Sequence, residues 1–209
     1  MKKVFLILLT CLIASTGVAA QKADEFGVVI DKRPFQELNE QICKKLSEKQ
    51  LDLSKPFAIT LTGKLTKESK LDDKRTKIET AEGSDPEMAQ IAVAAIQTLS
   101  DAGYFKYLSN LGATGGVVFK LGQDAEKVSS DIALEMETEE KAKTMASTLR
   151  SLFQAANQMI GPDDPSALLS KNALISANGK TMHMEFSAPA RLVAELIEKK
   201  VKNSTAPKQ

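Results

Sequence analysis

Residues 57–110 constrain the fold of this chain more than any other stretch, because two hydrophobic periodicities follow each other in them. Phe57, Ile59 and Leu61 alternate with small or polar residues, which is the period of a half-buried strand. A polar turn and a weaker strand around Ile78 come next, and then apolar residues recur every three or four positions. This recurrence predicts a helix whose buried stripe is Met88, Ile91, Ala92, Ala95, Leu99 and Ala102. The stretch therefore predicts two strands with a helix packed on them.

The predicted helix has a recognisable start. Ser84 comes just before Asp85 and Pro86, and Glu87 stands three residues after Ser84, which is the spacing of a capping box. We expect the Ser84 side chain to cap the free N–H groups of the first turn, where the helix dipole also favours acidic residues. Gly103 is expected to end or bend the helix.

A second unit of the same kind is expected after Gly115-Gly116. Residues 117–121 and 132–136 alternate as two strands that a hairpin connects. Thr138 is the expected cap of a helix with two glutamates in its first turn. We expect the glycine-rich residues 112–116 to be a flexible connection between the two units. A phosphate-binding loop would need a helix start and a lysine directly after the glycines, and neither follows here.

The dipeptide Asn178-Gly179 is the strongest hairpin signal in the chain. It predicts a type I′ turn, because that turn needs positive φ at both central positions. Alternation in the strand after it divides the side chains between two faces. Those expected to face the core are Met182, Met184 and Phe186, and those expected on the opposite face are Thr181, His183 and Glu185.

These patterns predict an α+β fold of antiparallel hairpins with helices packed on one face, arranged as three strand–strand–helix units after a leading helix that Pro34 opens. The units share almost no residue identity, so both an internal duplication and a non-repetitive domain stay open. The expected divisions are a signal peptide at 1–20 and the leading helix with the first unit at 21–110. The second and third units follow at 111–202, and a flexible tail at 203–209.

The first twenty residues have the three parts of a secretory signal peptide. Lys2 and Lys3 precede an apolar run, and small residues at 18–20 suit a signal peptidase, so we expect cleavage after Ala20 and a periplasmic or secreted protein. An uncleaved N-terminal anchor is the alternative, because residues 4–20 come close to the ~20 residues of a membrane span.

Charge and cysteine content narrow the class of partner. Removal of Lys2 and Lys3 lowers the 28 basic residues to 26 against 27 acidic ones, so we expect neither nucleic acid nor an anionic membrane as the main partner. Cys43 would then be the single cysteine, and no intrachain disulfide could form. We expect its side chain to be buried beside Ile42, as free cysteines usually are.

Candidate catalytic or metal-binding residues are few. His183 is the only histidine, and although Glu185 shares its strand face, a zinc site normally uses three or four ligands. No nucleophile motif accompanies His183. Glu135 and Glu137 lie two apart on a strand and are expected to face solvent. We therefore predict no cofactor, no metal and no enzymatic activity.

Three segments resemble the carboxy-terminal domain of TonB-family proteins. They are Phe57-Ala-Ile-Thr-Leu-Thr-Gly-Lys-Leu-Thr-Lys, Lys77-Ile78-Glu79 and Gly83-Ser-Asp-Pro-Glu-Met-Ala. The resemblance covers about a quarter of the chain and implies a small sheet packed on a helix that engages outer-membrane receptors from the periplasmic side. Glu68-Ser69 stands where the family has an Asp-Gly turn, and neither a Pro-rich spacer nor the family's closing strand is found.

The function expected from these observations is a non-enzymatic interaction or scaffold module of a bacterial envelope, acting on an envelope protein partner. The alternatives are a TonB-like energy transducer with a retained anchor, and a small-ligand binder or enzyme with a pocket near His183 or the methionines. The candidate interaction surface is the aromatic cluster of Tyr104, Phe105 and Tyr107, since aromatic anchors often dominate interfaces.

The intact mass of the protein from fractionated cells tests the export prediction. A chain that starts at Gln21 is expected in the soluble envelope fraction, because the small residues before it form the cleavage site. A full-length mass in the inner-membrane fraction would contradict cleavage and favour the anchored transducer.

Overall fold

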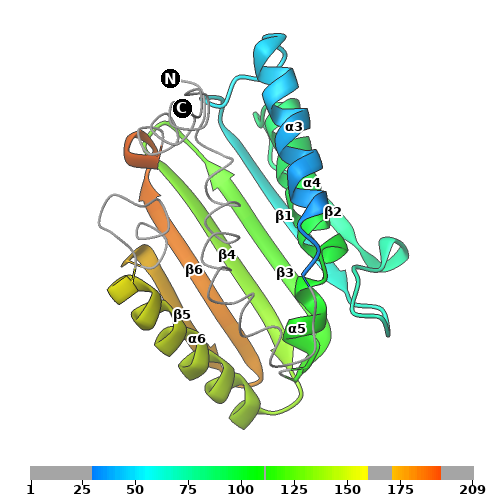
Figure 1. Cartoon of the computed structure of the whole chain (residues 1–209), viewed down its shortest axis with the longest axis vertical. Helices are drawn as coiled ribbons and strands as arrows, with labels where there is room; N and C mark the ends of the chain where they lie inside the picture. Colours follow the sequence, from blue (N-terminus) through cyan, green and yellow to red (C-terminus); the bar gives the residue numbers. More distant parts are fainter. Residues whose placement is uncertain (1–29, 111, 160–170, 194–209) are drawn as a thin grey trace, which may run out of the picture.

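The computed structural model describes residues 30–110, 112–159 and 171–193 (Figure 1). The predicted signal peptide and the flexible tail lie outside these residues. The described elements, in chain order, are α3 (Arg33–Ser47), β1 (Phe57–Lys64), the short helix η1 (Asp73–Arg75), β2 (Lys77–Thr80), α4 (Pro86–Asp101), α5 (Tyr104–Asn110), β3 (Ala113–Gln123), β4 (Lys127–Met136), α6 (Glu139–Met159), β5 (Ala173–Asn178) and β6 (Thr181–Pro189). No helix in this described part is both long and apolar enough to cross a bilayer.

The strands form one six-stranded sheet in the order β2-β1-β3-β4-β6-β5, with every neighbouring pair antiparallel. The three predicted hairpins are β1–β2, β3–β4 and β5–β6. β1 and β3 pair along the whole of β1, from Phe57 opposite Gln123 to Lys64 opposite Gly116. The predicted segments 21–110 and 111–202 therefore contribute to one continuous sheet.

The register of the strands places most of their apolar residues on a single face. Leu61 lies opposite Phe119, Phe119 opposite Ile132, and Ile132 opposite Met184. Because side chains alternate between faces, every second row is buried on the same face as this one. The buried residues of this face include Phe57, Ile59, Val117, Leu121, Val128, Leu134, Met136, Ile175, Met182 and Phe186.

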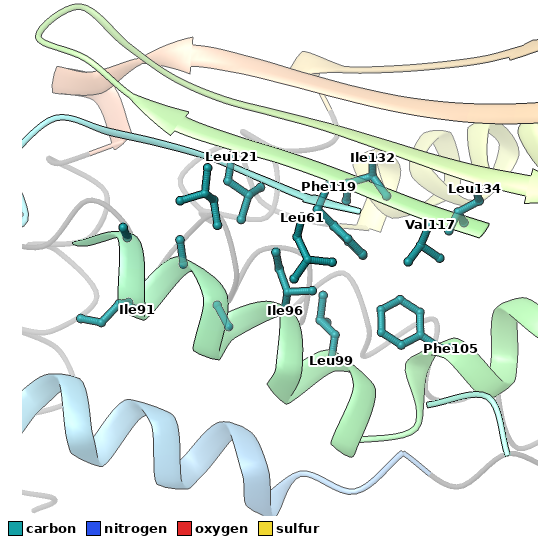
Figure 2. Packing of buried hydrophobic residues seen from close by; sticks show 14 of the residues in the cluster. Leu61, Ile91, Ile96, Leu99, Phe105, Val117, Phe119, Leu121, Ile132 and Leu134 are labelled. Atoms are coloured by element: carbon teal, nitrogen blue, oxygen red, sulfur yellow. The ribbon is translucent and has the colours of Figure 1, made fainter. Parts of the chain in front are cut away.

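Helices α4, α5 and α6 cover this face, which confirms the predicted α+β class with helices packed on one side (Figure 1). α4 packs on β1, and α6 packs on β4, β5 and β6. α3 packs on α4 through its buried Leu38 and Ile42, so this part of the protein has a second helical layer. Figure 2 shows Ile96 and Leu99 of α4 pointing toward Leu61 of β1.

Small side chains let α4 approach the sheet closely. Ala92 and Ala95 are fully buried, and all six residues of the predicted stripe are buried. The cap differs from the prediction, because Asp85 is the N-cap and its Oδ1 accepts the Met88 N–H at 3.0 Å. The Ser84 hydroxyl instead bonds to the backbone N–H and C=O of Ala58 on β1.

The loop between α3 and β1 is also part of the core. Leu51 and Leu53 are 3% and 1% exposed. The side-chain amide of Gln123, itself buried at the end of β3, donates to the Leu53 carbonyl at 2.8 Å and to the Lys55 carbonyl at 3.4 Å. This hydrogen bonding fixes the loop against the end of the sheet.

Two predictions about the turns are wrong. Asn178 pairs with Thr181, so the central residues of the β5–β6 turn are Gly179 and Lys180. Only Gly179 among them has a positive φ, 54°, whereas a type I′ turn needs two such residues. The expected flexible connection at Gly115 is instead part of β3, where an irregularity in the ladder with β4 falls between Ala113 and Val117.

The predicted burial of Cys43 is also wrong, because its side chain is exposed. The helix α3 buries the stripe that contains Leu38 and Ile42, and Cys43 follows Ile42 by one residue. One residue corresponds to about 100° around a helix, so Cys43 points away from α4.

An enlarged side chain at Ala92 should destabilise the protein, because Ala92 is fully buried in the core, where side chains are close-packed. We expect Ala92→Leu to lower the free energy of unfolding by about 1–3 kcal/mol. Gln90→Leu on the exposed side of the same helix is the control, with an expected change within about 0.5 kcal/mol. Urea denaturation measures both; equal effects at the two positions would contradict the close packing.

Candidate functional site on the open face of the sheet

The face of the sheet opposite α4, α5 and α6 carries mainly polar and small side chains, and we call it the open face. Its central members come from β1, β3, β4 and β6. They are Thr60, Thr62, Val118, Lys120, Ser129, Asp131, Ala133, Thr181, His183, Glu185 and Ser187. All of them are half-buried or exposed. The described helices lie on the other face, so none of them covers these side chains.

A row of charged residues crosses the open face from strand to strand. Thr60 of β1 lies opposite both Glu79 of β2 and Lys120 of β3. Lys120 lies opposite Asp131 of β4, and Asp131 lies opposite Glu185 of β6. Side chains directly opposite each other on neighbouring strands interact, so this row is a continuous polar surface across five strands.

Asp131 is the centre of this row. The Nζ of Lys120 lies 3.5 Å from its Oδ2, and the Nδ1 of His183 lies 3.7 Å from its Oδ1. The Asp131 and His183 side chains are 33% and 30% exposed, and Lys120 is 60% exposed. The Oδ1 atom is itself buried and accepts no hydrogen bond from the described residues. A distance of 3.7 Å is too long for a hydrogen bond, so His183 acts on Asp131 as a charge, and only when protonated.

The other candidate chemical groups do not converge on this centre. His183 and Glu185 share the open face as predicted, but within the described ranges no three His, Cys, Asp or Glu side chains are grouped to hold a metal ion. Glu135 and Glu137 are exposed as predicted. Glu137 pairs with Lys141 at the start of α6. The described charged or ionisable groups next to Asp131 are Lys120, His183 and Glu185.

The three aromatic residues of the predicted interaction surface have different surroundings. Phe105 is 1% exposed and packs edge-to-face on Phe119 at 5.8 Å between ring centroids, so it belongs to the core (Figure 2). Tyr104 packs edge-to-face on Phe35 of α3 at 5.9 Å and is half-buried. The side chain of Tyr107 lies outside the described part of the structure. Phe105 therefore cannot contact a partner while the protein is folded, and a surface made of all three is excluded.

The turn between β3 and β4 sets the register that brings Lys120 opposite Asp131. The Oδ1 of Asp124 accepts the backbone N–H groups of Lys127 and Glu126, both at 2.8 Å. These bonds favour the ionised carboxylate, and they lower the pKa of Asp124 below its ordinary value of 3.8, with the Lys127 N–H as the largest cause. A hairpin turn fixes the pairing of its strands, so Asp124 supports the geometry of the open face indirectly.

Comparison of the chain with protein-family models, with curated proteins and with solved structures found no match. The function of the open face therefore has to be inferred from its own geometry.

Local sequence could reveal only part of this site. The alternation in β6 correctly placed His183 and Glu185 on the face away from the core. No local signal pairs Lys120 with Asp131, because the two residues lie in different strands. They become neighbours only through the β3–β4 register.

The lowered pKa of Asp124 predicts a contribution to stability that depends on pH. A depressed pKa in the folded state stabilises the protein above the pKa of the unfolded chain, and this contribution is lost as pH falls through the folded value. Urea denaturation of the wild type and of Asp124→Asn should therefore show a stability difference that is constant above about pH 5 and shrinks below about pH 4. A difference that does not change with pH would contradict this role of the carboxylate.

Proposed function

We propose that this protein is an exported, non-enzymatic interaction module of a bacterial envelope, and that the open face of its sheet contacts an envelope protein partner. The observation that carries the proposal is the charged row centred on Asp131, on the face that the described helices leave uncovered.

The arrangement of charges on this face supports recognition over stability. Exposed ion pairs such as Lys120–Asp131 contribute only about 0–1 kcal/mol to folding. Asp131 and Glu185 carry like charges directly opposite each other, which is destabilising. A partner that places cationic groups over these two carboxylates would relieve the repulsion, so the face is complementary to a basic or mixed-charge protein surface.

Site-specific photo-crosslinking in cells of the native host tests this proposal. Thr62 and Ser187 are exposed positions on opposite sides of the open face, and each is replaced in turn by a photoreactive amino acid. We expect both to yield an adduct of the same mass, because one partner would span the face. The matched control is Thr144, exposed on α6, from which no such adduct is expected.

A charge change then ties the adduct to the proposed centre. Asp131→Lys should abolish the adduct, since it reverses the charge that the partner recognises, while Glu139→Lys on α6 should leave it intact. Adducts that form equally from Thr144, or that persist unchanged in Asp131→Lys, would contradict the open face as the binding surface. Circular dichroism of each variant separates lost binding from lost folding.

The TonB-like energy transducer is the second proposal that the sequence suggests. It requires a retained N-terminal anchor, so the intact mass of the protein separates it from a freely diffusing module. Both proposals place the protein at the envelope, and the crosslinking experiment applies to both.

A further inference from the structure

β2 is one end of the sheet, and its outer edge has no neighbouring strand among the described residues. The four-residue strand is exposed throughout. Ile78 is 43% exposed, which makes it one of the few large apolar side chains that are exposed among the described residues. An edge strand presents backbone donors and acceptors that another strand can bind, so this edge is a potential pairing site.

The register of β1 and β2 determines which backbone groups point outward. The N–H of Ala81 donates to the Ala58 carbonyl, and opposing residues in an antiparallel pair alternate between bonded and non-bonded pairs. Glu79 and Lys77, which lie two and four residues before Ala81, therefore bond to β1. The N–H and C=O groups of Ile78 and Thr80 point away from β1, toward the outer edge.

We propose that a second copy of this chain pairs with this edge, antiparallel to β2 about a two-fold axis at Ile78. Ile78 then lies opposite Ile78 of the second copy, and their outward N–H and C=O groups bond to each other. Thr76 has extended dihedrals, φ −101° and ψ 125°, and lies opposite Thr80 of the second copy. The outward backbone groups of the two edges therefore match in position along the whole strand.

Charge selects this register over its neighbours. With the axis at Ile78, Lys77 lies opposite Glu79 of the second copy, and the same pair occurs twice by symmetry. A shift that places the axis at Lys77 brings two lysines opposite each other, and a shift to Glu79 brings two glutamates opposite each other. Opposite charges across strands stabilise a pair and like charges destabilise it, so a single register satisfies backbone and side chains together.

This self-complementarity favours a second copy over an unrelated strand. Lys77 and Glu79 already form an ion pair within the strand at 2.6 Å, and they remain 75% and 61% exposed, so both can also reach a partner. The short strand covers far less than the roughly 1,200 Å² typical of stable interfaces, and we therefore expect a weak, reversible dimer. The inference concerns the sheet edge and does not depend on the function proposed for the open face.

Complementary charge variants test the pairing by sedimentation velocity over a range of concentrations. Wild type should show reversible dimerisation. Lys77→Glu and Glu79→Lys should each raise the dimer dissociation constant by roughly tenfold, because every cross-strand pair becomes repulsive. An equimolar mixture of the two variants should regain wild-type association as a heterodimer, since each acidic strand then faces a basic one.

A matched mixture excludes a general charge effect. Lys143→Glu and Glu139→Lys make the same changes in an exposed ion pair on α6, and their mixture should dimerise no better than wild type. Ile78→Pro removes an outward N–H without removing a bond to β1, and it should abolish dimerisation while the protein stays folded. A wild type that stays monomeric at millimolar concentration, or a variant mixture that does not associate, would overturn the proposal.

Discussion

The close approach of α4 to the sheet is the contact on which the rest of the structure depends. Ala92 and Ala95 allow this approach because neither has a side chain that extends beyond Cβ. α4 is buried on two sides, against the sheet and against α3, so few of its positions tolerate a polar group. Thr98 and Ser100 are the buried polar residues of this helix, and both hydroxyls are hydrogen-bonded. The Thr98 hydroxyl donates to the Ala94 carbonyl. The Ser100 hydroxyl accepts the Leu71 N–H. The second of these bonds connects α4 to the β1–β2 connection, and thereby to the edge of the sheet.

Burial on a single face of the sheet leaves the side chains of the opposite face uncovered by the described helices. Antiparallel sheets tolerate one solvated face, and the inner strands β1, β3, β4 and β6 each pair with a strand on both sides. Asp131, Lys120 and His183 are therefore positioned by a backbone ladder whose hydrogen bonds do not involve their side chains. A rigid platform of this kind holds charges in fixed relative positions, which is what a selective contact with another protein requires.

Exposed ion pairs occur at both places where we propose contacts, and they differ in how they are held. The Lys77–Glu79 pair lies along one strand, and each partner favours the charged form of the other, which raises the pKa of Lys77 and lowers that of Glu79. The Lys120–Asp131 pair lies across two strands, so its geometry depends on the β3–β4 register. The first is a property of the edge strand alone, whereas the second is a property of the assembled sheet.

The sequence by itself determined the features that depend on local periodicity. It predicted the strand and helix types, the buried stripe of α4 and the α+β class, because a repeat of two or of 3.6 residues places apolar side chains on one face wherever the segment ends up. Only the tertiary structure decided the strand order, the cross-strand neighbours of Asp131, the burial of Leu51 and Leu53, and the use of Asp85 in place of Ser84 as the cap. Each of these depends on contacts between residues far apart in the chain, as when Ser84 bonds to Ala58 and leaves the cap to its neighbour.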